Sequence, residues 1–159
     1  GVQIDQEANI NLVGTGKYPK LDKRFSGSFG SALMYYVIPK VILFREEHSP
    51  RTLVKKVDFI SAPGVSKESL YRPGGPKYLL TNKALFSFNK NNKRFCLEKT
   101  APGINQGDIK KLTGFKYDLN TSIKNFILPS KSRLKILRKI IAPMVSEFYP
   151  HFAKKIWSN

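Results

Sequence analysis

Three segments decide the fold of this chain: VDFISAPG at Val57–Gly64, GGPKYLLTNKALFSFN at Gly74–Asn89 and LEKTAPGINQGDIKKLTGF at Leu97–Phe115. A Gly-Gly-Pro turn opens the second segment, and the alternation of apolar and polar residues that follows is typical of a strand. The third segment contains a helical pattern at Gln106–Leu112, with Asn105 placed to cap its N-terminus. The order predicts strands, a hairpin and a short helix, although no segment is a catalytic motif.

Further elements are expected on both sides of these segments. A helix is expected at Ser31–Val37, capped near Ser28 or Ser31. The apolar run KVILF predicts a strand buried on both faces of a sheet. The expected elements are this strand at Lys40–Phe44, a second one within Leu53–Ile60, a hairpin turn at NKNNK (89–93), a strand at Arg94–Glu98 and a long amphipathic helix at Lys131–Ile141.

Composition favours one folded α/β domain. The chain has 159 residues, of which 41% are hydrophobic, enough for a real core. The single cysteine, Cys96, excludes a disulfide framework and predicts a buried structural thiol in a reducing compartment. No apolar run is long enough to span a membrane and no secretory signal is visible, so a cytoplasmic protein is expected. With two histidines and no carboxylate spaced to join them, no metal site is expected.

The quoted segments resemble the β-type subunit of family I CoA-transferases, the glutaconate and 3-oxoacid CoA-transferase group. In that family VDF-x-x-x-PG, a GGP-opened hairpin and an ending in TGF occur in this order. GVQIDQEANIN at residues 1–11 is similar to the family's G-x-Q-x-D turn, with Ala8 where the family has glycine, and Leu128–Pro143 resembles its closing helix. The resemblance covers residues 1–143 as the C-terminal part of a β-subunit-like domain, and residues 144–159 are an extension. It implies a CoA-transferase-like (NagB/RpiA-type) α/β fold: an open, largely parallel sheet with helices on its faces, a β-hairpin and a C-terminal amphipathic helix.

The resemblance implies an enzyme that moves CoA between an acyl-CoA and a carboxylic acid through a glutamyl-CoA intermediate. The family's nucleophile is a glutamate that is usually followed by Asn-Gly, and none of the six glutamates here is followed by Asn-Gly. We therefore expect the nucleophile on another segment and this chain alone to be inactive. Its expected partners are an α-type subunit and that segment, in a hetero-oligomer. Coenzyme A and acyl-CoA are the expected substrates, with no metal.

The family's glycine-rich GxGGA segment, whose main-chain amides help to stabilise the oxyanion, is similar to SGSFGSALMYY at Ser26–Tyr36. Carried over by position, the candidates for the oxyanion and CoA site are Gly27, Ser28, Phe29 and Gly30. Phe29 departs from the family, because it adds bulk and disfavours a positive φ. The other interpretation, that Gly27 and Gly30 only permit a tight turn, has equal weight. Secondary candidates are Gln3, Asp5, Asn11, Pro63 and Gly64, which are expected first to hold turns and loops.

Several alternatives remain open. A related CoA-ester hydrolase that opens a ring would also suit the missing glutamate, and a non-catalytic scaffold subunit would suit Phe29. The net charge of +17 fits an acidic partner or CoA phosphates, a lysine-rich background, or nucleic-acid binding. Nucleic acid is the least favoured partner, because no reader motif is present. For the basic amphipathic helix at Lys131–Ile141, packing on the body of the protein is favoured over a membrane surface or a calmodulin-type partner.

Overall fold

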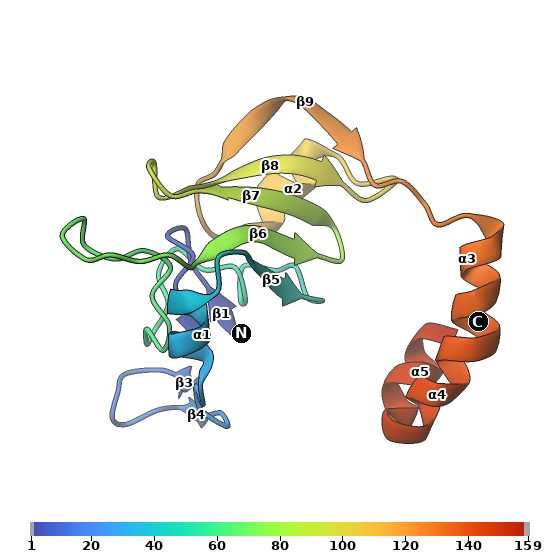
Figure 1. Cartoon of the computed structure of the whole chain (residues 1–159), viewed down its shortest axis with the longest axis horizontal. Helices are drawn as coiled ribbons and strands as arrows, with labels where there is room; N and C mark the ends of the chain where they lie inside the picture. The colour runs from blue at the N-terminus through green and yellow to red at the C-terminus, as the bar shows by residue number, and fades with distance from the viewer. Residues whose placement is uncertain (1, 158–159) are drawn as a thin grey trace. The chain divides into compact units, whose positions relative to one another are not determined.

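The computed structural model describes residues 2–157, which form two compact units (Figure 1). The first unit ends at Phe126 and the second begins at Ile127. This division separates two parts that each make most of their contacts within themselves. The boundary expected after residue 143 instead separates the part that resembles the family from the C-terminal extension, and it stays a prediction. No helix of the described residues is long and apolar enough to cross a membrane.

A five-stranded sheet forms the centre of the first unit, in the order β5-β6-β7-β8-β9. The two inner pairings are antiparallel and the two outer ones, β5 with β6 and β8 with β9, are parallel. The strands are β5 (Val41–Arg45), β6 (Pro76–Thr81), β7 (Ala84–Asn89), β8 (Arg94–Thr100) and β9 (Asp118–Asn125). The expected α/β fold with a hairpin is confirmed, and the sheet of this chain is mixed.

Two short antiparallel ribbons precede the sheet. The strands β1 (Gln3–Ile4) and β2 (Ile10–Asn11) form the first ribbon, and β3 (Gly14–Thr15) and β4 (Lys23–Arg24) form the second. The backbone of Ile4 also bonds with Thr52 and Val54, and that of Ile10 with Ala62. These bonds attach the loop between β5 and β6 to the N-terminal ribbon.

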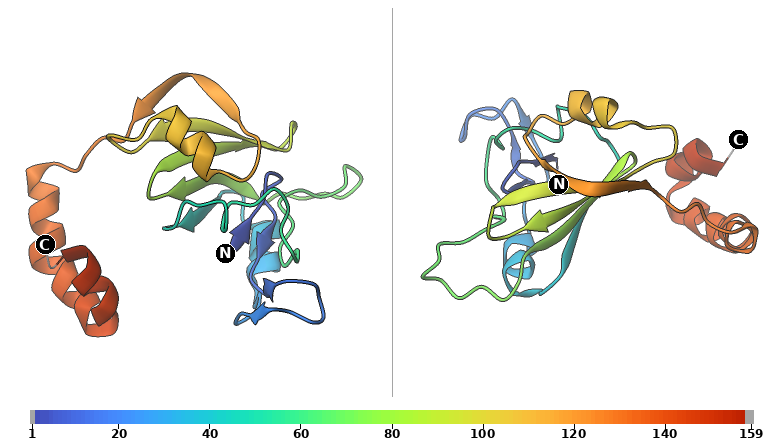
Figure 2. Two further views of the ribbon diagram at one scale, coloured as in Figure 1. Left: turned by 180° about the vertical axis from the view of Figure 1, so that it is seen from behind. Right: turned by 90° about the horizontal axis from the view of Figure 1, so that it is seen from above.

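The helices α1 (Ser31–Val37) and α2 (Gln106–Leu112) have the expected boundaries and lie on opposite sides of the sheet (Figure 2). In α2 the Asn105 side chain accepts from the Asp108 amide, and the Asp108 carboxylate accepts from the Asn105 amide, which is a complete capping box. The cap expected for α1 is wrong. Its N-cap is Gly30, with no side-chain bond, because the Ser31 hydroxyl turns back to the Ser28 carbonyl.

Aromatic rings form the centre of the core on the α2 side of the sheet. Phe86 and Phe95 are fully buried and Phe115, which follows α2, is 5% exposed. The ring centroids of Phe95 and Phe115 are 5.4 Å apart, and Tyr117 meets Phe86 edge-on at 5.2 Å. Such contacts stabilise the core beyond the burial of area alone. They fix the segment after α2 against β7 and β8.

Two expectations for individual strands are wrong, and one strand of the structure was not expected. The strand expected at Lys40–Phe44 is β5, but Ile42 and Phe44 are 60% and 64% exposed, because β5 is an edge strand whose alternate side chains face away from the core. The segment Leu53–Ile60 forms no strand, since its backbone follows turns and only Leu53 makes a bridge, to Ile4. The strand β9 was not expected at all, because DLNTSIKN is polar and lacks apolar alternation.

The second unit consists of helices. They are α3 (Lys131–Ile136), a π-helical turn η1 (Leu137–Ile141), α4 (Ala142–Phe148) and α5 (Pro150–Trp157). The helix expected to end at Ile141 therefore continues past Pro143. Proline lacks an N–H and its ring clashes with a carbonyl of the preceding turn, and the wider turn η1 lies where that clash would fall. The predicted apolar stripe consists of Leu134, Leu137, Ile140 and Ile141. Ile140 is 55% exposed, Ile141 39% and Leu137 37%, whereas Leu134 is half-buried.

Candidate functional site

The loop from Gly27 to Gly30 joins β4 to α1 and contains all four leading candidates. Gly27 has a φ of 102°, and its amide donates to the Leu12 carbonyl. Phe29 has a φ of 47° and its side chain is 84% exposed. The phenylalanine therefore keeps a left-handed backbone conformation that glycine adopts without strain. Its ring packs on none of the core residues.

Gly30 has neither of the usual structural reasons for being glycine. Its φ of −82° is open to any residue, and a Cβ added there would meet nothing within 4 Å. Among the described residues, the amides of Phe29 and Gly30 donate to no backbone carbonyl. The loop thus presents two amide donors on a surface without side-chain bulk at Gly30. Backbone of this kind can approach another molecule closely.

Three secondary candidates, Gln3, Asp5 and Asn11, are buried in a polar network. The Asp5 carboxylate accepts from the Asn9 amide at 3.0 Å and from the Asn9 side chain at 3.1 Å. The Asn11 side chain donates to Gln3 at 2.8 Å and to the Gly14 carbonyl at 2.6 Å. Because these polar atoms are satisfied within the chain, the contacts describe the turn-holding role expected for them.

The other two, Pro63 and Gly64, adjoin the same network. The Gly64 amide donates to the Asn9 side chain at 3.0 Å, and a Cβ on Gly64 would lie 2.0 Å from the Glu7 carbonyl oxygen. Glycine is therefore required at position 64 by packing. Nearby Ala8 has a φ of 60°, the position where the family has glycine. The structure brings these residues together with Gln3 and Asp5, and the Gly27–Gly30 loop is joined to the same region by the bond from the Gly27 amide to the Leu12 carbonyl.

His48 is a buried polar residue in the loop after β5. Its Nδ1 lies 2.8 Å from the Thr81 hydroxyl and its Nε2 2.9 Å from that of Thr113. The Thr113 hydroxyl donates to the Ile109 carbonyl, so it accepts from His48 Nε2–H. Burial, helped by Lys83, lowers the pKa of His48 to about 4. This neutral imidazole connects β6 to α2, and no local sequence signal indicates that role.

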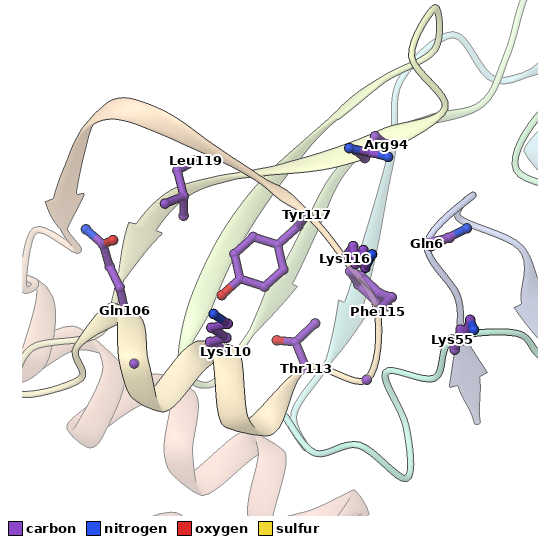
Figure 3. A pocket seen from close by; sticks show the side chains of 12 residues that line it. Gln6, Lys55, Arg94, Gln106, Lys110, Thr113, Phe115, Lys116, Tyr117 and Leu119 are labelled. Atoms are coloured by element: carbon purple, nitrogen blue, oxygen red, sulfur yellow. The ribbon is translucent and has the colours of Figure 1, made fainter.

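A cavity of about 1010 Å³ opens on the α2 side of the sheet (Figure 3). The rings of Phe115 and Tyr117 form part of its wall, and Lys110 of α2 also lines it. Its cationic lining residues are Lys55, Arg94, Lys110 and Lys116. The Arg94 guanidinium is already paired with Asp118 at 3.2 Å. Since α1 lies on the other side of the sheet, one small substrate cannot contact both this cavity and the Gly27–Gly30 loop.

Neither Glu47 nor Cys96 is an activated nucleophile. The Glu47 carboxylate accepts from Arg51 at 2.8 Å, from Ser49 and from Arg45, and these bonds lower its pKa to about 2. Burial and the nearby carboxylates of Glu98 and Asp118 raise the pKa of Cys96, so its thiol stays protonated at neutral pH. Within residues 2–157 no group of three or more metal-ligating side chains gathers.

No model of a protein family matches the chain. It is 29% identical over 150 residues to the B-type subunit of glutaconate CoA-transferase from Acidaminococcus fermentans, covering 90% of this chain and 55% of that protein. The crystal structure of the same organism's glutaconate coenzyme A-transferase matches with a TM-score of 0.81 and 28% identity, over 91% of this chain and 57% of that one. The chain thus spans about half the length of the relatives it matches.

A further structure shares the fold at lower identity. IpdAB of Rhodococcus jostii matches with a TM-score of 0.78 at 21% identity, over 89% of this chain and 58% of that one. At that identity the likeness speaks only for the fold. The sequence and structural matches to glutaconate CoA-transferase agree with the motifs at Val57–Gly64 and Gly74–Asn89. In sequence and in fold, this chain is therefore similar to the B-type subunit of glutaconate CoA-transferase.

Proposed function

We propose that this chain is the C-terminal part of the B-type subunit of a heteromeric CoA-transferase. An α-type subunit completes the CoA site, and a separate segment supplies the nucleophilic glutamate. The proposal is supported by the similarity to the B-type subunit of glutaconate CoA-transferase. The single observation that connects the proposal with a site is the glycine at position 30. Neither its φ nor the space around it requires glycine in this chain.

The proposed reaction has two stages. The glutamate carboxylate attacks the thioester carbonyl of the acyl-CoA, giving an acyl-glutamyl anhydride and the CoA thiolate. The thiolate then attacks the glutamyl carbonyl, which forms glutamyl-CoA and releases the donor carboxylic acid. The acceptor acid takes CoA by the reverse of these steps. Each stage passes through a tetrahedral oxyanion, which needs hydrogen-bond donors already in place.

The Gly27–Gly30 loop is proposed to supply those donors through the amides of Phe29 and Gly30. Both amides are free of backbone acceptors among the described residues. Removing one such donor costs about a hundredfold or more in kcat in enzymes that stabilise an oxyanion. The secondary candidates act indirectly in this proposal, because the contacts of Gln3, Asp5 and Asn11 hold neighbouring turns.

The test is to reconstitute the complex from this chain, an α-type subunit and a segment that carries a glutamate followed by Asn-Gly. Incubation with acyl-CoA should yield a glutamyl-CoA adduct on that segment, detected by intact mass spectrometry. Gly30→Ala should slow adduct formation at an unchanged mass of the complex, because a methyl group intrudes where the thioester approaches. Lys56→Ala, an exposed change elsewhere, is the control.

A non-catalytic scaffold subunit is the second candidate, and Phe29 is the observation that favours it. Its exposed ring adds bulk to the loop that should receive the thioester. An adduct that forms at the same rate with Gly30→Ala as with the unchanged chain would favour this role. Formation of free acid without any adduct would instead favour the CoA-ester hydrolase.

A further inference from the structure

Arg72 lies against the C-terminal half of α1, in the long loop before β6. Its Nη2 donates to the Tyr35 carbonyl at 2.9 Å and its Nη1 to the Ser66 hydroxyl at 3.3 Å. The guanidinium carbon is 5.2 Å from the centroid of the Tyr35 ring and 5.8 Å from that of Tyr36. These contacts fix the orientation of the guanidinium. Arginine has five N–H donors, so several remain for another acceptor.

Lys90 reaches the same place from the hairpin between β7 and β8. Its ammonium donates to the Gly74 carbonyl at 2.7 Å. Gly75 has a φ of 137°, and a Cβ added there would lie 3.4 Å from Lys90 Nζ and 3.6 Å from Arg72 Nη2. The two cations therefore flank one point above the Gly74–Gly75 turn. No side chain fills that point, because residue 75 is glycine.

Within residues 2–157, neither of these two cations forms an ion pair with a carboxylate. Burial is the main cause that lowers the pKa of both Arg72 and Lys90, and the charges of Arg72 and Lys77 lower that of Lys90 further. Neighbouring like charges without a counter-charge are unfavourable unless an anion binds between them.

A cavity of about 240 Å³ adjoins the pair and is lined by Arg72 and Lys90 together with Lys67 and Lys93. Glu68 is the one acidic residue of its lining, and it is exposed to solvent. The cavity thus offers four cations against one carboxylate. That balance, with a fixed guanidinium able to bind two oxygens at once, suits a phosphate group better than a carboxylate of a small acid.

We propose that Arg72 and Lys90 bind the phosphate groups of the acyl-CoA substrate. This inference rests on the proposed function, and it adds a place for the nucleotide end of that substrate. The Gly74 and Gly75 amides bond to the carbonyls of Tyr36 and Ile38, at the C-terminal end of α1. The Gly27–Gly30 loop lies at the other end of the helix, which at seven residues is about 10 Å long. A pantetheine arm extended along α1 spans that separation.

The large cavity on the α2 side is the competing place for the phosphates. It is also basic, but its Arg94 is paired with Asp118, and it lies across the sheet from α1 (Figure 2). Phosphates bound there would leave the thioester on the wrong face to meet Gly30. Lys110, which lines that cavity, therefore provides a matched control for Lys90.

The test measures binding to the full chain by isothermal titration calorimetry, with CoA and inorganic pyrophosphate as separate probes at fixed salt. Lys90→Gln should weaken the affinity for both probes roughly tenfold, the worth of one charge-assisted hydrogen bond. Lys90→Arg should restore most of the affinity, and Lys110→Gln should leave it unchanged. Thermal unfolding of each variant checks that the fold is kept.

The outcomes separate this site from the function on which it rests. Pyrophosphate binding that depends on Lys90, without tighter binding of CoA, would keep a phosphate site but overturn its assignment to the acyl-CoA substrate. CoA binding that is unaffected by Lys90→Gln, or lowered equally by Lys110→Gln, would overturn the site while leaving that function standing. Failure of both probes to bind the unchanged chain would also overturn the site.

Discussion

Phe29 has a left-handed backbone conformation that suits glycine, whereas its neighbour Gly30 has a conformation that suits any residue. The phenylalanine has a φ of 47°, whereas the glycine has a φ of −82° that any residue can adopt. A substitution at Phe29 can therefore relieve strain, and one at Gly30 need not create any. This contrast separates the requirements of the fold from those of the proposed site.

Replacing Phe29 by glycine should stabilise the chain by about 1 kcal/mol. The left-handed conformation costs a non-glycine residue about 1–2 kcal/mol, and the greater flexibility of the unfolded glycine chain offsets part of that gain. Loss of the ring costs little, because it is 84% exposed. Urea denaturation measures the change. Phe29→Ala is the matched control, since it removes the ring and keeps the strain, and equal stabilities of the two variants would refute this account.

Gly30→Ala should destabilise the chain by only about 0.5–1 kcal/mol, because alanine is a poorer N-cap than glycine but its Cβ would meet open space. Gly64→Ala should destabilise the chain severely, because its Cβ would lie 2.0 Å from the Glu7 carbonyl oxygen. Urea denaturation of both variants gives the comparison. A large loss of unfolding free energy in Gly30→Ala would show that the fold itself requires this glycine. Gly30 would then no longer support a binding role for the loop.

The stability of the chain should fall between pH 6.5 and 4 because of His48. Its folded-state pKa of about 4 lies below the usual value of 6.5, so the unfolded state binds the proton more tightly. The stabilisation is present in full above pH 6.5 and is lost as the pH falls toward 4, by roughly 3 kcal/mol. Chemical denaturation across this range should show a shallower pH dependence for His48→Gln than for the unchanged chain. His151→Gln, at an exposed site, should retain the full slope.

The open edge of β5 should promote self-association of the isolated chain. Ile42 and Phe44 are exposed on a parallel edge strand, and such edges pair with other chains unless they are covered or charged. Ile42→Lys should raise the monomer fraction measured by analytical ultracentrifugation, with little effect on stability. Lys77→Arg, which keeps the charge of an exposed strand residue, serves as the control. Equal self-association of Ile42→Lys and the unchanged chain would show that this edge is not the contact.

Local signals predicted the elements whose side chains alternate or cap in sequence. The strands β6, β7 and β8 follow from apolar alternation, and α2 follows from Asn105, the predicted N-cap, whose side chain accepts from the Asp108 amide. The motifs at Val57–Gly64 and Gly74–Asn89 carried the family resemblance. The polar strand β9 escaped prediction, because its pairing with β8 comes from backbone hydrogen bonds that need no apolar side chain.

The sequence by itself determined the α/β class, the resemblance to a family and the positions of α1 and α2, because these depend on residues close together in the chain. Only the tertiary structure decided that His48 joins Thr81 to Thr113, and that Arg72 and Lys90 flank Gly75. The tertiary structure also decided that β5 is an edge strand, whereas its apolar sequence predicted a strand buried on both faces of the sheet. Burial, charge pairing and edge position depend on neighbours that are distant in sequence, so folding alone brings them into contact.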